Sequence, residues 1–379
     1  MKRDRSLRVL HIAPSFARKD GGPSEVLRGL LPALKSLGIQ VTVVATDKGV
    51  DESDSDFIAT NDVRIASAHA PKSWSYAPGV RKLIRRAVAG VDVVHVHSIH
   101  THTTTVALSE CFRAGVPVLL EPHGALDSYH LRQGATKKRL YSRIFDRRGL
   151  RNLAGAIYSS SKELDEGNNF LRDTQSFVMP LGVDSSLFDA KRSPSGVPTV
   201  LFLGRITEKK HLDHLLRAMA DPNVLALNPQ LVVAGPADPD LSYRPADLVE
   251  SLGLGENVSF LGQVTSVQRL ELLSRANAFV LPSDDESFGM AVAEALAAAC
   301  PTIVTPEVGI AVDAAAAGAL YLCATDAADL SGVLLHVLSD RVGAEAVGRR
   351  GRTYAQQSFT WDAAAATAVQ IYTSVRDER

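Results

Sequence analysis

Two glutamates, Glu286 and Glu294, lie on either side of a turn that leads into an alanine-rich stretch. The apolar residues 279–281 predict a short buried strand, residues 282–285 break it, and residues 291–299 favour a helix that stops at Pro301. Two carboxylates in one pocket first suggest the acid and nucleophile of a glycosidase. In one helix, however, they would lie about 12 Å apart along the axis, whereas glycosidase carboxyls are about 5 to 9.5 Å apart. We therefore expect the two glutamates to contact different parts of one elongated ligand.

Backbone amides between the two glutamates complete this candidate site. The first amides of a helix have no partner inside the helix and point toward an anion. A ligand with a sugar, a diphosphate and a ribose in a line would fit, with Glu286 at the sugar and Glu294 at the ribose. A solvated acidic turn followed by an exposed helical glutamate is the alternative for any one of these residues taken alone. The amides belong to Ser287, Phe288, Gly289 and Met290.

A basic turn, Gly204 to Lys210, follows the apolar run 199–203. The planar fork of Arg205 suits two phosphate oxygens, and Lys210 offers a mobile point charge. The turn therefore predicts a diphosphate site, with a basic surface turn that binds no ligand as the alternative.

Two loops in the first half of the chain are further candidates. Gly21 and Gly22 precede a predicted helix, so their backbone can approach an anion closely, although turn chemistry alone also explains a double glycine. His123 follows the apolar run 117–121 and precedes Gly124. A histidine at a strand end can donate, accept or carry a proton near neutral pH, although a lone loop histidine is more often only exposed.

The densest group of histidines is His95, His97, His100 and His102. His95 and His97 alternate along a predicted strand and therefore point to one face. No nearby cysteine or Glu-x-x-His pattern completes a ligand set, and zinc needs three or four fixed ligands. The sequence disfavours a metal site here, and no metal is expected.

The elements that hold these residues form two series. Apolar, β-branched runs alternate with helical patterns over residues 7–180, turn formers fill residues 180–198, and a second series follows. This rhythm predicts an α/β protein with two doubly wound parallel sheets, each covered on both faces. The predicted domains are residues 1–185 and 195–355, followed by an amphipathic helix at 356–379. Such sheets bind ligands beyond the carboxyl ends of their strands, so two facing domains predict a cleft.

Length, net charge and cysteine content limit the classes of function that the chain can have. The 379 residues suffice for two domains, and 41 Lys plus Arg nearly cancel 42 Asp plus Glu, so no nucleic-acid partner is expected. Three cysteines without metal-like spacing favour a reducing, cytoplasmic compartment. The first apolar run, of about six residues, is too short for a signal sequence or a membrane span.

Together these residues resemble the signature of retaining glycosyltransferase family 4. The resemblance covers essentially the whole chain, with one departure: the glycine that usually follows the lysine of the basic turn is His211. The motifs that carry it are Gly21-Gly22, His123-Gly124, Arg205 with Lys210, Glu286 with Ser287-Phe288-Gly289, and Glu294.

The resemblance implies a GT-B fold, in which two Rossmann-like domains face each other across a cleft and the terminal helix crosses back onto the first domain. It implies a hexosyltransferase that uses a UDP- or GDP-linked sugar and needs no metal or other cofactor. The residues expected to take part in catalysis are His123, Arg205, Lys210 and Glu286. The resemblance also implies that Gly21 and Gly22 contact the donor phosphate and that the backbone at Gly262 and Val264 holds the nucleobase. It places His97 at the acceptor.

Two other readings remain open: a sugar-nucleotide epimerase of the same architecture, and a non-catalytic subunit that binds a nucleotide sugar. A dehydrogenase is disfavoured because the first strand lacks the glycine fingerprint that follows it in dinucleotide-binding proteins. The context His123 to Asp127 resembles enzymes that build bacterial surface polysaccharides, which favours a glycan acceptor on a lipid carrier.

The segment Arg132 to Ala154 bears on where the protein acts. It carries eight basic residues and one acidic residue, with apolar residues at helical spacing. Such a helix can lie on the inner face of the cytoplasmic membrane. A domain helix with solvated charges is the equal alternative.

Overall fold

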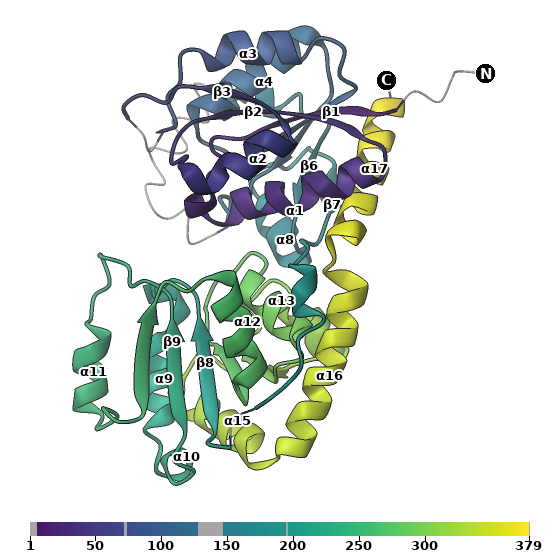
Figure 1. The fold of residues 1–379 in the computed structure, drawn as a ribbon. Coiled ribbons are helices and arrows are strands. Elements are labelled where there is room, and N and C mark those ends of the chain that lie inside the picture. Colours follow the sequence, from purple (N-terminus) through teal and green to yellow (C-terminus); the bar gives the residue numbers. More distant parts are fainter. Residues whose placement is uncertain (1–5, 72–73, 128–146, 195, 379) are drawn as a thin grey trace. The chain divides into compact units, whose positions relative to one another are not determined.

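The computed structural model describes residues 6–71, 74–127, 147–194 and 196–378. The chain forms two compact units (Figure 1). Unit 1 comprises residues 1–182 and 361–379, and unit 2 comprises residues 183–360. The end of the chain therefore belongs to the same unit as its beginning.

Unit 1 is built on a parallel sheet whose seven described strands follow the order β3-β2-β1-β4-β5-β6-β7. The strands are apolar along most of their length because helices cover both faces of the sheet. Their bounds are β1 Arg8–Ile12, β2 Gln40–Thr46, β3 Asp62–Ala66, β4 Val93–His97, β5 Val118–Glu121, β6 Gly155–Tyr158 and β7 Ser176–Val178. The described helices are α1 Gly22–Ser36, α2 Ser55–Thr60, α3 Val80–Ala87, α4 His102–Ala114, α7 Arg147–Leu150, α8 Ser161–Asn168 and α17 Trp361–Asp377.

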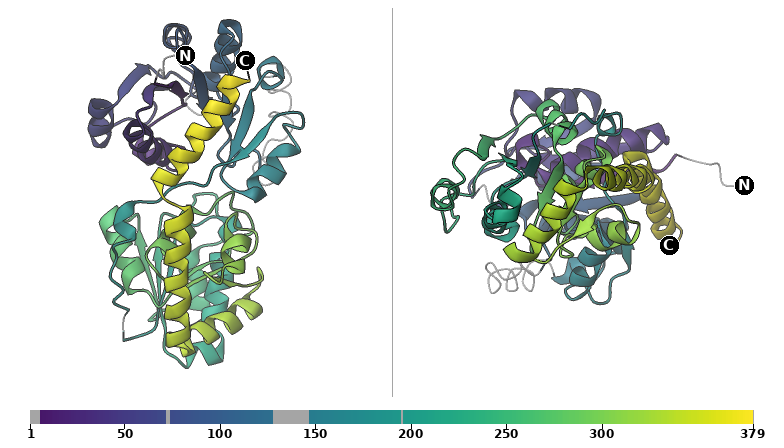
Figure 2. Two further views of the ribbon diagram at one scale, coloured as in Figure 1. Left: turned by 90° about the vertical axis from the view of Figure 1, so that its right-hand side faces the viewer. Right: turned by 90° about the horizontal axis from the view of Figure 1, so that it is seen from below.

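Alternation along the strands divides the core of unit 1 into two layers. Val9 of β1 packs in the layer with α1 and α17, whereas Leu10 packs on the opposite face with α3 and α4. Helix α17, drawn in yellow, runs along its face of the sheet (Figure 2). Its first residue, Trp361, lies so close to Gly29 of α1 that an added Cβ would be 1.9 Å from the indole ring. The last helix is therefore an integral part of this core.

Unit 2 contains a second parallel sheet, with six described strands in the order β10-β9-β8-β11-β12-β13. The strands are β8 Thr199–Leu203, β9 Gln230–Ala234, β10 Val258–Gly262, β11 Ala278–Leu281, β12 Thr302–Val304 and β13 Tyr321–Leu322. The described helices are α9 Leu212–Met219, α10 Pro222–Leu225, α11 Pro245–Ser251, α12 Ser266–Arg275, α13 Met290–Ala297, α14 Ala311–Ala316, α15 Ala327–Ser339 and α16 Arg341–Ser358.

Both sheets share one topological feature, which we call the strand-order reversal. It lies between β1 and β4 in unit 1 and between β8 and β11 in unit 2. Loops that leave neighbouring strands at such a point diverge and open a crevice at the carboxyl ends of the strands. The loops after these four strands are therefore the first places to look for a ligand site.

Candidate active site

The basic turn and the first glutamate meet at the strand-order reversal of unit 2. β8 and β11 are parallel neighbours, so their carboxyl ends lie on one edge of the sheet. Arg205 follows β8 and is exposed, and among the described residues it has no ion-pair partner. Lys210 ends a short 3-10 helix, Glu208–Lys210, in the same loop.

Lys210 and Glu286 are in direct contact. Lys210 Nζ lies 3.3 Å from Glu286 Oε1, and Lys209 Nζ lies 3.9 Å from the same oxygen. An added Cβ on Gly204 would be 2.9 Å from Lys210 Nζ, so this ammonium lies against the end of β8. Two ammonium groups face one carboxylate, and the remaining positive charge suits an anionic ligand.

Main-chain bonds hold Glu286 in place from two sides. The carbonyl of Lys209 accepts hydrogen bonds from Ser283 Oγ and Asp284 N, each at 2.9 Å, and so joins the loops after β8 and β11. On the other side, Gly309 N donates to the carbonyl of Glu286 at 2.8 Å. The position of the Glu286 carboxylate is thus fixed by neighbouring loops as well as by the lysines.

His211, the departure from the family pattern, has a backbone conformation that favours glycine. Its φ is 45° and its ψ is 48°, in the left-handed region. The ring compensates with polar contacts, because Nε2 lies 3.3 Å from Asp284 Oδ2 and Nδ1 lies 3.8 Å from Asp213 Oδ1. Hydrogen bonding to Asp213, followed by that to Asp284, raises the pKa of His211. The substitution therefore leaves Lys210 beside Glu286.

Helix α13 begins immediately after the acidic turn. Gly289 precedes it with a φ of 98° and no side-chain cap, and Phe288 is buried against Phe359. The structure places the predicted segment 287–290 at this helix N-terminus. Contact of its amides with a donor stays a prediction.

Glu294 lies inside α13 and is buried. Its carboxylate forms an ion pair with Arg269 of α12. This excludes the reading of Glu294 as a freely exposed helical residue. The contact with a ribose stays a prediction.

The predicted nucleobase segment lies on the same edge of the sheet of unit 2. Gly262 is the last residue of β10, and its carbonyl accepts a hydrogen bond from Gly235 N at 2.7 Å. Val264 follows it and is half-buried. The structure therefore places Gly262 and Val264 beyond a carboxyl strand end, where such sheets bind ligands.

In unit 1, the double glycine lies in the loop after β1. Gly21 precedes α1 with a φ of 76°, and Gly22 is the first residue of the helix. No described atom lies within 4 Å of a Cβ added at either position. The backbone at this helix N-terminus is therefore open to close approach.

Unit 1 also contains a group of buried polar side chains that we call the histidine cluster. It lies near the strand-order reversal, at the carboxyl ends of β1, β4 and β5, on the face that α17 covers. Its members are His11, His95, His97, Glu121, His123 and Tyr372. His100 and His102 lie elsewhere, against Phe170 and Tyr76 respectively.

The cluster forms a continuous series of contacts. Tyr372 Oη lies 2.8 Å from His95 Nδ1, and His95 Nε2 lies 3.0 Å from Glu121 Oε2. His97 Nδ1 lies 3.3 Å from the same oxygen and 2.9 Å from His123 Nε2. His97 Nε2 lies 2.9 Å from His11 Nδ1.

Burial lowers the pKa of three histidines of this cluster. Desolvation is the main cause that lowers the pKa of His11, His97 and His123, and it brings the pKa of His97 to about 4. For Glu121, burial raises the pKa, but the neighbouring histidines outweigh it and hold the pKa well below its ordinary value. Glu121 is thus a carboxylate in a cluster in which the imidazoles of His11, His97 and His123 are neutral.

The predicted histidines have different surroundings in the structure. His97 is fully buried, so its ring is not at the surface where an acceptor would bind, and its predicted acceptor contact remains a prediction. The side chain of His123 is 6% exposed, and both ring nitrogens face other cluster members. Sequence reasoning did not assign roles to His11, Glu121 or Tyr372. His11 and Glu121 lie at the ends of β1 and β5, and this position was the signal by which they could have been found.

Three groups of described side chains bring potential metal ligands within 4.8 Å of one another. Two lie in the histidine cluster, where the facing nitrogens already contact each other at 2.9 Å. An ion there would have to replace those contacts. The groups are His11 with His95 and His97, His97 with Glu121 and His123, and His211 with Asp213 and His214.

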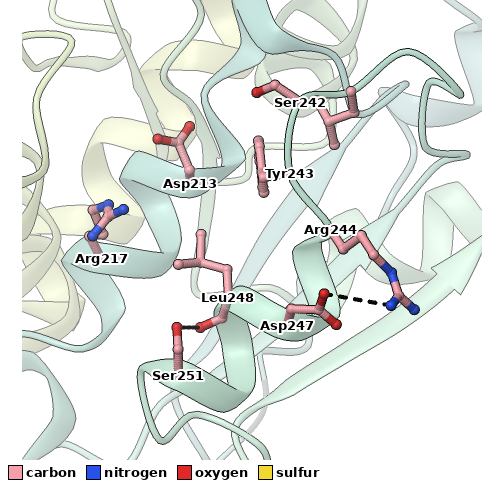
Figure 3. Close-up of a pocket in the computed structure, with 9 residues that line it drawn as sticks. Asp213, Arg217, Ser242, Tyr243, Arg244, Asp247, Leu248 and Ser251 are labelled. Carbon is pink, nitrogen blue, oxygen red and sulfur yellow. Dashed lines mark hydrogen bonds and ion pairs between the residues drawn. The ribbon is translucent and has the colours of Figure 1, made fainter.

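A separate surface pocket of unit 2, of about 610 Å³, lies between α9 and α11 (Figure 3). Asp213 and Arg217 line it from α9, and Tyr243 lines it from the loop before α11. None of the residues that line it is a predicted site residue, so this pocket and the Lys210–Glu286 contact are different features.

The membrane prediction is only partly accessible to the structure. Residues 132–146 of the basic segment lie outside the described residues. Within the described part of the chain, helices are too short or too polar to cross a bilayer.

Comparison with known protein families gives two matches that follow the two units. Residues 21–182 match the glycosyl transferase 4-like domain, and residues 184–354 match the glycosyl transferases group 1 domain. An uncharacterized glycosyltransferase of Methanocaldococcus jannaschii is 30% identical over 46% of this chain and 44% of its own length. The GDP-mannose:cellobiosyl-diphosphopolyprenol alpha-mannosyltransferase of Xanthomonas oryzae is 25% identical over 77% of each chain.

Solved structures with the same fold span nearly the whole chain. Sucrose-phosphate synthase from Thermosynechococcus elongatus has a TM-score of 0.76 at 21% identity, over 98% of this chain and 100% of that one. HepE of Anabaena, solved with UDP-glucose, has a TM-score of 0.73 at 18% identity, over 98% and 99%. The prediction of two Rossmann-like domains of the GT-B type is thereby confirmed.

Proposed function

Since this chain belongs to glycosyltransferase family 4, we propose that it transfers a hexose from a nucleoside diphosphate sugar to a glycan, with retention of configuration. The observation that carries this proposal is the contact of Lys210 with Glu286 at the strand-order reversal of unit 2. This contact joins two residues from distant parts of the sequence, to which we assign the binding of phosphate (Lys210) and of the sugar (Glu286).

The chemistry follows from where charge develops. As the bond between the sugar and the diphosphate breaks, negative charge accumulates on the diphosphate, and fixed cations stabilise it most in the transition state. Arg205 and Lys210 take this role, together with the amides of residues 287–290. Glu286 and His123 hold the sugar, and Glu294 holds the ribose. The acceptor hydroxyl attacks from the face that the diphosphate leaves, which retains the configuration at the anomeric carbon.

Two relatives guide the choice of substrates. HepE is described in complex with UDP-glucose, and the Xanthomonas enzyme is named for GDP-mannose and a diphosphopolyprenol-linked acceptor. We therefore propose a UDP- or GDP-linked hexose as donor and a lipid-linked glycan of surface polysaccharide biosynthesis as acceptor. The proposed location is the cytoplasm, with contact to the membrane surface through residues 132–154. No metal or further cofactor is required in this proposal.

The test begins with a panel of UDP- and GDP-sugars in thermal unfolding. A ligand at 100 times its dissociation constant adds about 2.7 kcal/mol to the stability of the state that binds it. The donor identified in this way is then incubated with polyprenyl-diphosphate glycans, with and without EDTA, and the anomeric configuration of the product is read by NMR.

Each outcome decides between functions. Transfer with retention, unchanged by EDTA, supports the proposal. Conversion of the donor without any acceptor shows an epimerase. Binding of the donor with neither transfer nor slow hydrolysis shows a binding subunit, and an inverted product overturns the retaining mechanism.

A further inference from the structure

Glu121 is a buried carboxylate whose partners are unusual. Its side chain is 1% exposed, and among the described residues the groups within ion-pair distance of it are His95, His97 and His123. A buried charge is costly unless hydrogen-bond donors surround it. Neither oxygen of Glu121 has a well-aligned hydrogen-bond partner among the described residues. The nearby imidazoles therefore stabilise its charge by turning N–H groups rather than lone pairs toward it, and this preference fixes their tautomers.

The first branch runs from Tyr372 through His95. Tyr372 Oη lies 2.8 Å from His95 Nδ1, and His95 Nε2 lies 3.0 Å from Glu121 Oε2. A neutral imidazole has one N–H and one acceptor nitrogen. With the proton of His95 on Nε2 toward the carboxylate, Nδ1 accepts the hydroxyl proton of Tyr372. The hydrogen bond between Tyr372 and His95 is then made, whereas the contact of His95 Nε2 with Glu121 is electrostatic, since it lacks hydrogen-bond alignment.

The second branch runs through His97. A proton on His97 Nδ1 is donated to His123 Nε2 at 2.9 Å, and the same nitrogen lies 3.3 Å from Glu121 Oε2. His123 Nε2 is then the acceptor, so the proton of His123 lies on Nδ1, which faces Glu121 Oε1 at 3.5 Å. His97 Nε2 accepts from His11 Nδ1 at 2.9 Å, and His11 Nε2, which has no partner among the described residues, carries no proton.

The opposite assignment of the protons of His97 and His123 is unfavourable next to Glu121. If His123 donated from Nε2 to His97, the unprotonated Nδ1 atoms of both rings would face Glu121 at 3.3 and 3.5 Å. Lone pairs would then oppose a buried negative charge on two sides. The charge of Glu121 therefore selects the Nδ1–H form of both imidazoles.

We propose that Glu121 is a positioning residue, which fixes the tautomers of His97 and His123 and thereby holds His123 in one place. The inference deepens the proposed function and rests on it only where His123 is said to hold the sugar. With both nitrogens of His123 turned inward, the carbon edge of its ring and its main chain remain for a substrate.

A second carboxylate fixes the backbone at the same point. Glu163 of α8 accepts from Gly124 N at 2.6 Å and from Ser159 N at 2.7 Å. His123 has a φ of 53° and Gly124 a φ of 76°, so both lie in the left-handed region. Glu163 thus holds the main chain of the loop that contains His123, while Glu121 sets the tautomer and orientation of the His123 ring. The two carboxylates, His11, His95 and His97, together with Tyr372 of α17, are the titratable groups around His123.

Long-range nitrogen–proton NMR of the full chain tests the inference without any substrate, with histidine signals assigned by single substitutions. We expect both His97 and His123 in the Nδ1–H form in the unsubstituted protein. An Nε2–H form of His123 there overturns the proposal, whether or not any variant folds. So does a bound metal ion that occupies these nitrogens in the purified protein.

Glu121→Gln removes the charge with little change in size. We expect mixed tautomers at His123 and a fall in kcat of about tenfold or more, with the donor KM changed less than about threefold, because only the orientation of the imidazole is lost. The matched control is Glu110→Gln, which neutralises another buried carboxylate of unit 1, paired instead with Arg81, Arg85 and Arg113.

The control separates positioning from general destabilisation. We expect Glu110→Gln to lower the unfolding temperature while it leaves the tautomer of His123 and kcat as they are. Equal effects of both substitutions on kcat would overturn the positioning role. An unchanged tautomer in Glu121→Gln would do the same. If no donor is ever transferred but the tautomers behave as expected, the proposed function fails and the role of Glu121 stands.

Discussion

The strand-order reversals of the two units have the same topology but opposite electrostatics. In unit 1, between β1 and β4, the histidine cluster is buried and the imidazoles of His11, His97 and His123 are neutral. In unit 2, between β8 and β11, Arg205 is exposed and Lys210 and Glu286 keep 15% and 17% of their side chains in solvent. The same backbone arrangement therefore does not determine the chemistry at a strand-order reversal. The side chains at the ends of the strands determine it.

This difference distinguishes residues that hold a conformation from residues that can bind a ligand. Buried polar groups that satisfy one another fix a conformation, because breaking any one bond leaves a partner unsatisfied. Charges that remain accessible can exchange solvent for a ligand. Substitutions in unit 1 should therefore change stability or the position of His123, and substitutions in unit 2 should change turnover.

The largest effect is expected from Arg205→Ala or Lys210→Ala. Each should reduce kcat by about 10² or more, because a cation that meets the departing diphosphate is lost. Arg205→Ala should lower the unfolding temperature little, since that side chain is exposed, whereas Lys210→Ala also removes the ion pair with Glu286 and should lower it more. Steady-state transfer assays measure this, with Arg275→Ala, on an exposed ion pair of α12, as the control. Near-normal turnover in both variants would remove the phosphate role.

The pH dependence of stability should have opposite signs in the two units. The folded-state pKa of His97 is about 4, below its ordinary 6.5, so the unfolded chain takes up the proton first as pH falls. Unit 1 should lose stability between about pH 6.5 and 4, on the order of 3 kcal/mol from His97. The pKa of His211 in unit 2 is raised, so its contribution is present below pH 6.5 and lost as pH rises through the raised value.

Hydrogen exchange at a series of pH values measures this effect for each unit, which a single unfolding curve of a two-unit protein does not. Equal protection of the strands of unit 1 at pH 5 and pH 7 would contradict the buried, neutral state of the cluster.

A smaller loss is expected from His95→Ala in unit 1. The substitution leaves the hydroxyl of Tyr372 without its partner and removes one of the two imidazoles beside Glu121 Oε2, and should cost roughly 1–3 kcal/mol. Tyr372→Phe removes only one end of the same contact and should cost about 1 kcal/mol. Denaturant unfolding followed by exchange in β4 and α17 measures both. A cost for Tyr372→Phe that exceeds that for His95→Ala would show that the contact is not the source.

The smallest expected difference compares two glycines of unit 2. Gly289 and Gly262 both have positive φ, 98° and 64°. A Cβ at Gly289 would lie 2.5 Å from Val308 Cγ1, whereas nothing lies within 4 Å of one at Gly262. Gly289→Ala should therefore lower the free energy of unfolding by about 1 kcal/mol more than Gly262→Ala does, because steric overlap adds to backbone strain. Equal losses would indicate that Val308 moves freely.

The same contrast explains what could be predicted from the sequence. Local patterns predicted the buried strand at residues 279–281, which the structure has as Ala278–Leu281. Loop chemistry predicted that Lys210 and Glu286 serve one ligand, and they are in contact because the carboxyl ends of neighbouring parallel strands lie on one edge of the sheet. The histidine cluster was missed as a unit. His11, Glu121 and Tyr372 come from distant parts of the chain, and only the register of β1, β4 and β5 and the docking of α17 bring them together.

Helix α17 completes the hydrophobic layer of unit 1, although the whole of unit 2 precedes it in the chain. While the ribosome is still making unit 2, the layer that α17 will cover, together with the nitrogen of His95 that Tyr372 will meet, remains without its cover. Domains generally fold as units and from the N-terminus during synthesis. Unit 1 can reach its final state only after unit 2 and α17 have been translated, so we expect the part of the nascent chain that forms unit 1 to need chaperones for longer than the part that forms unit 2.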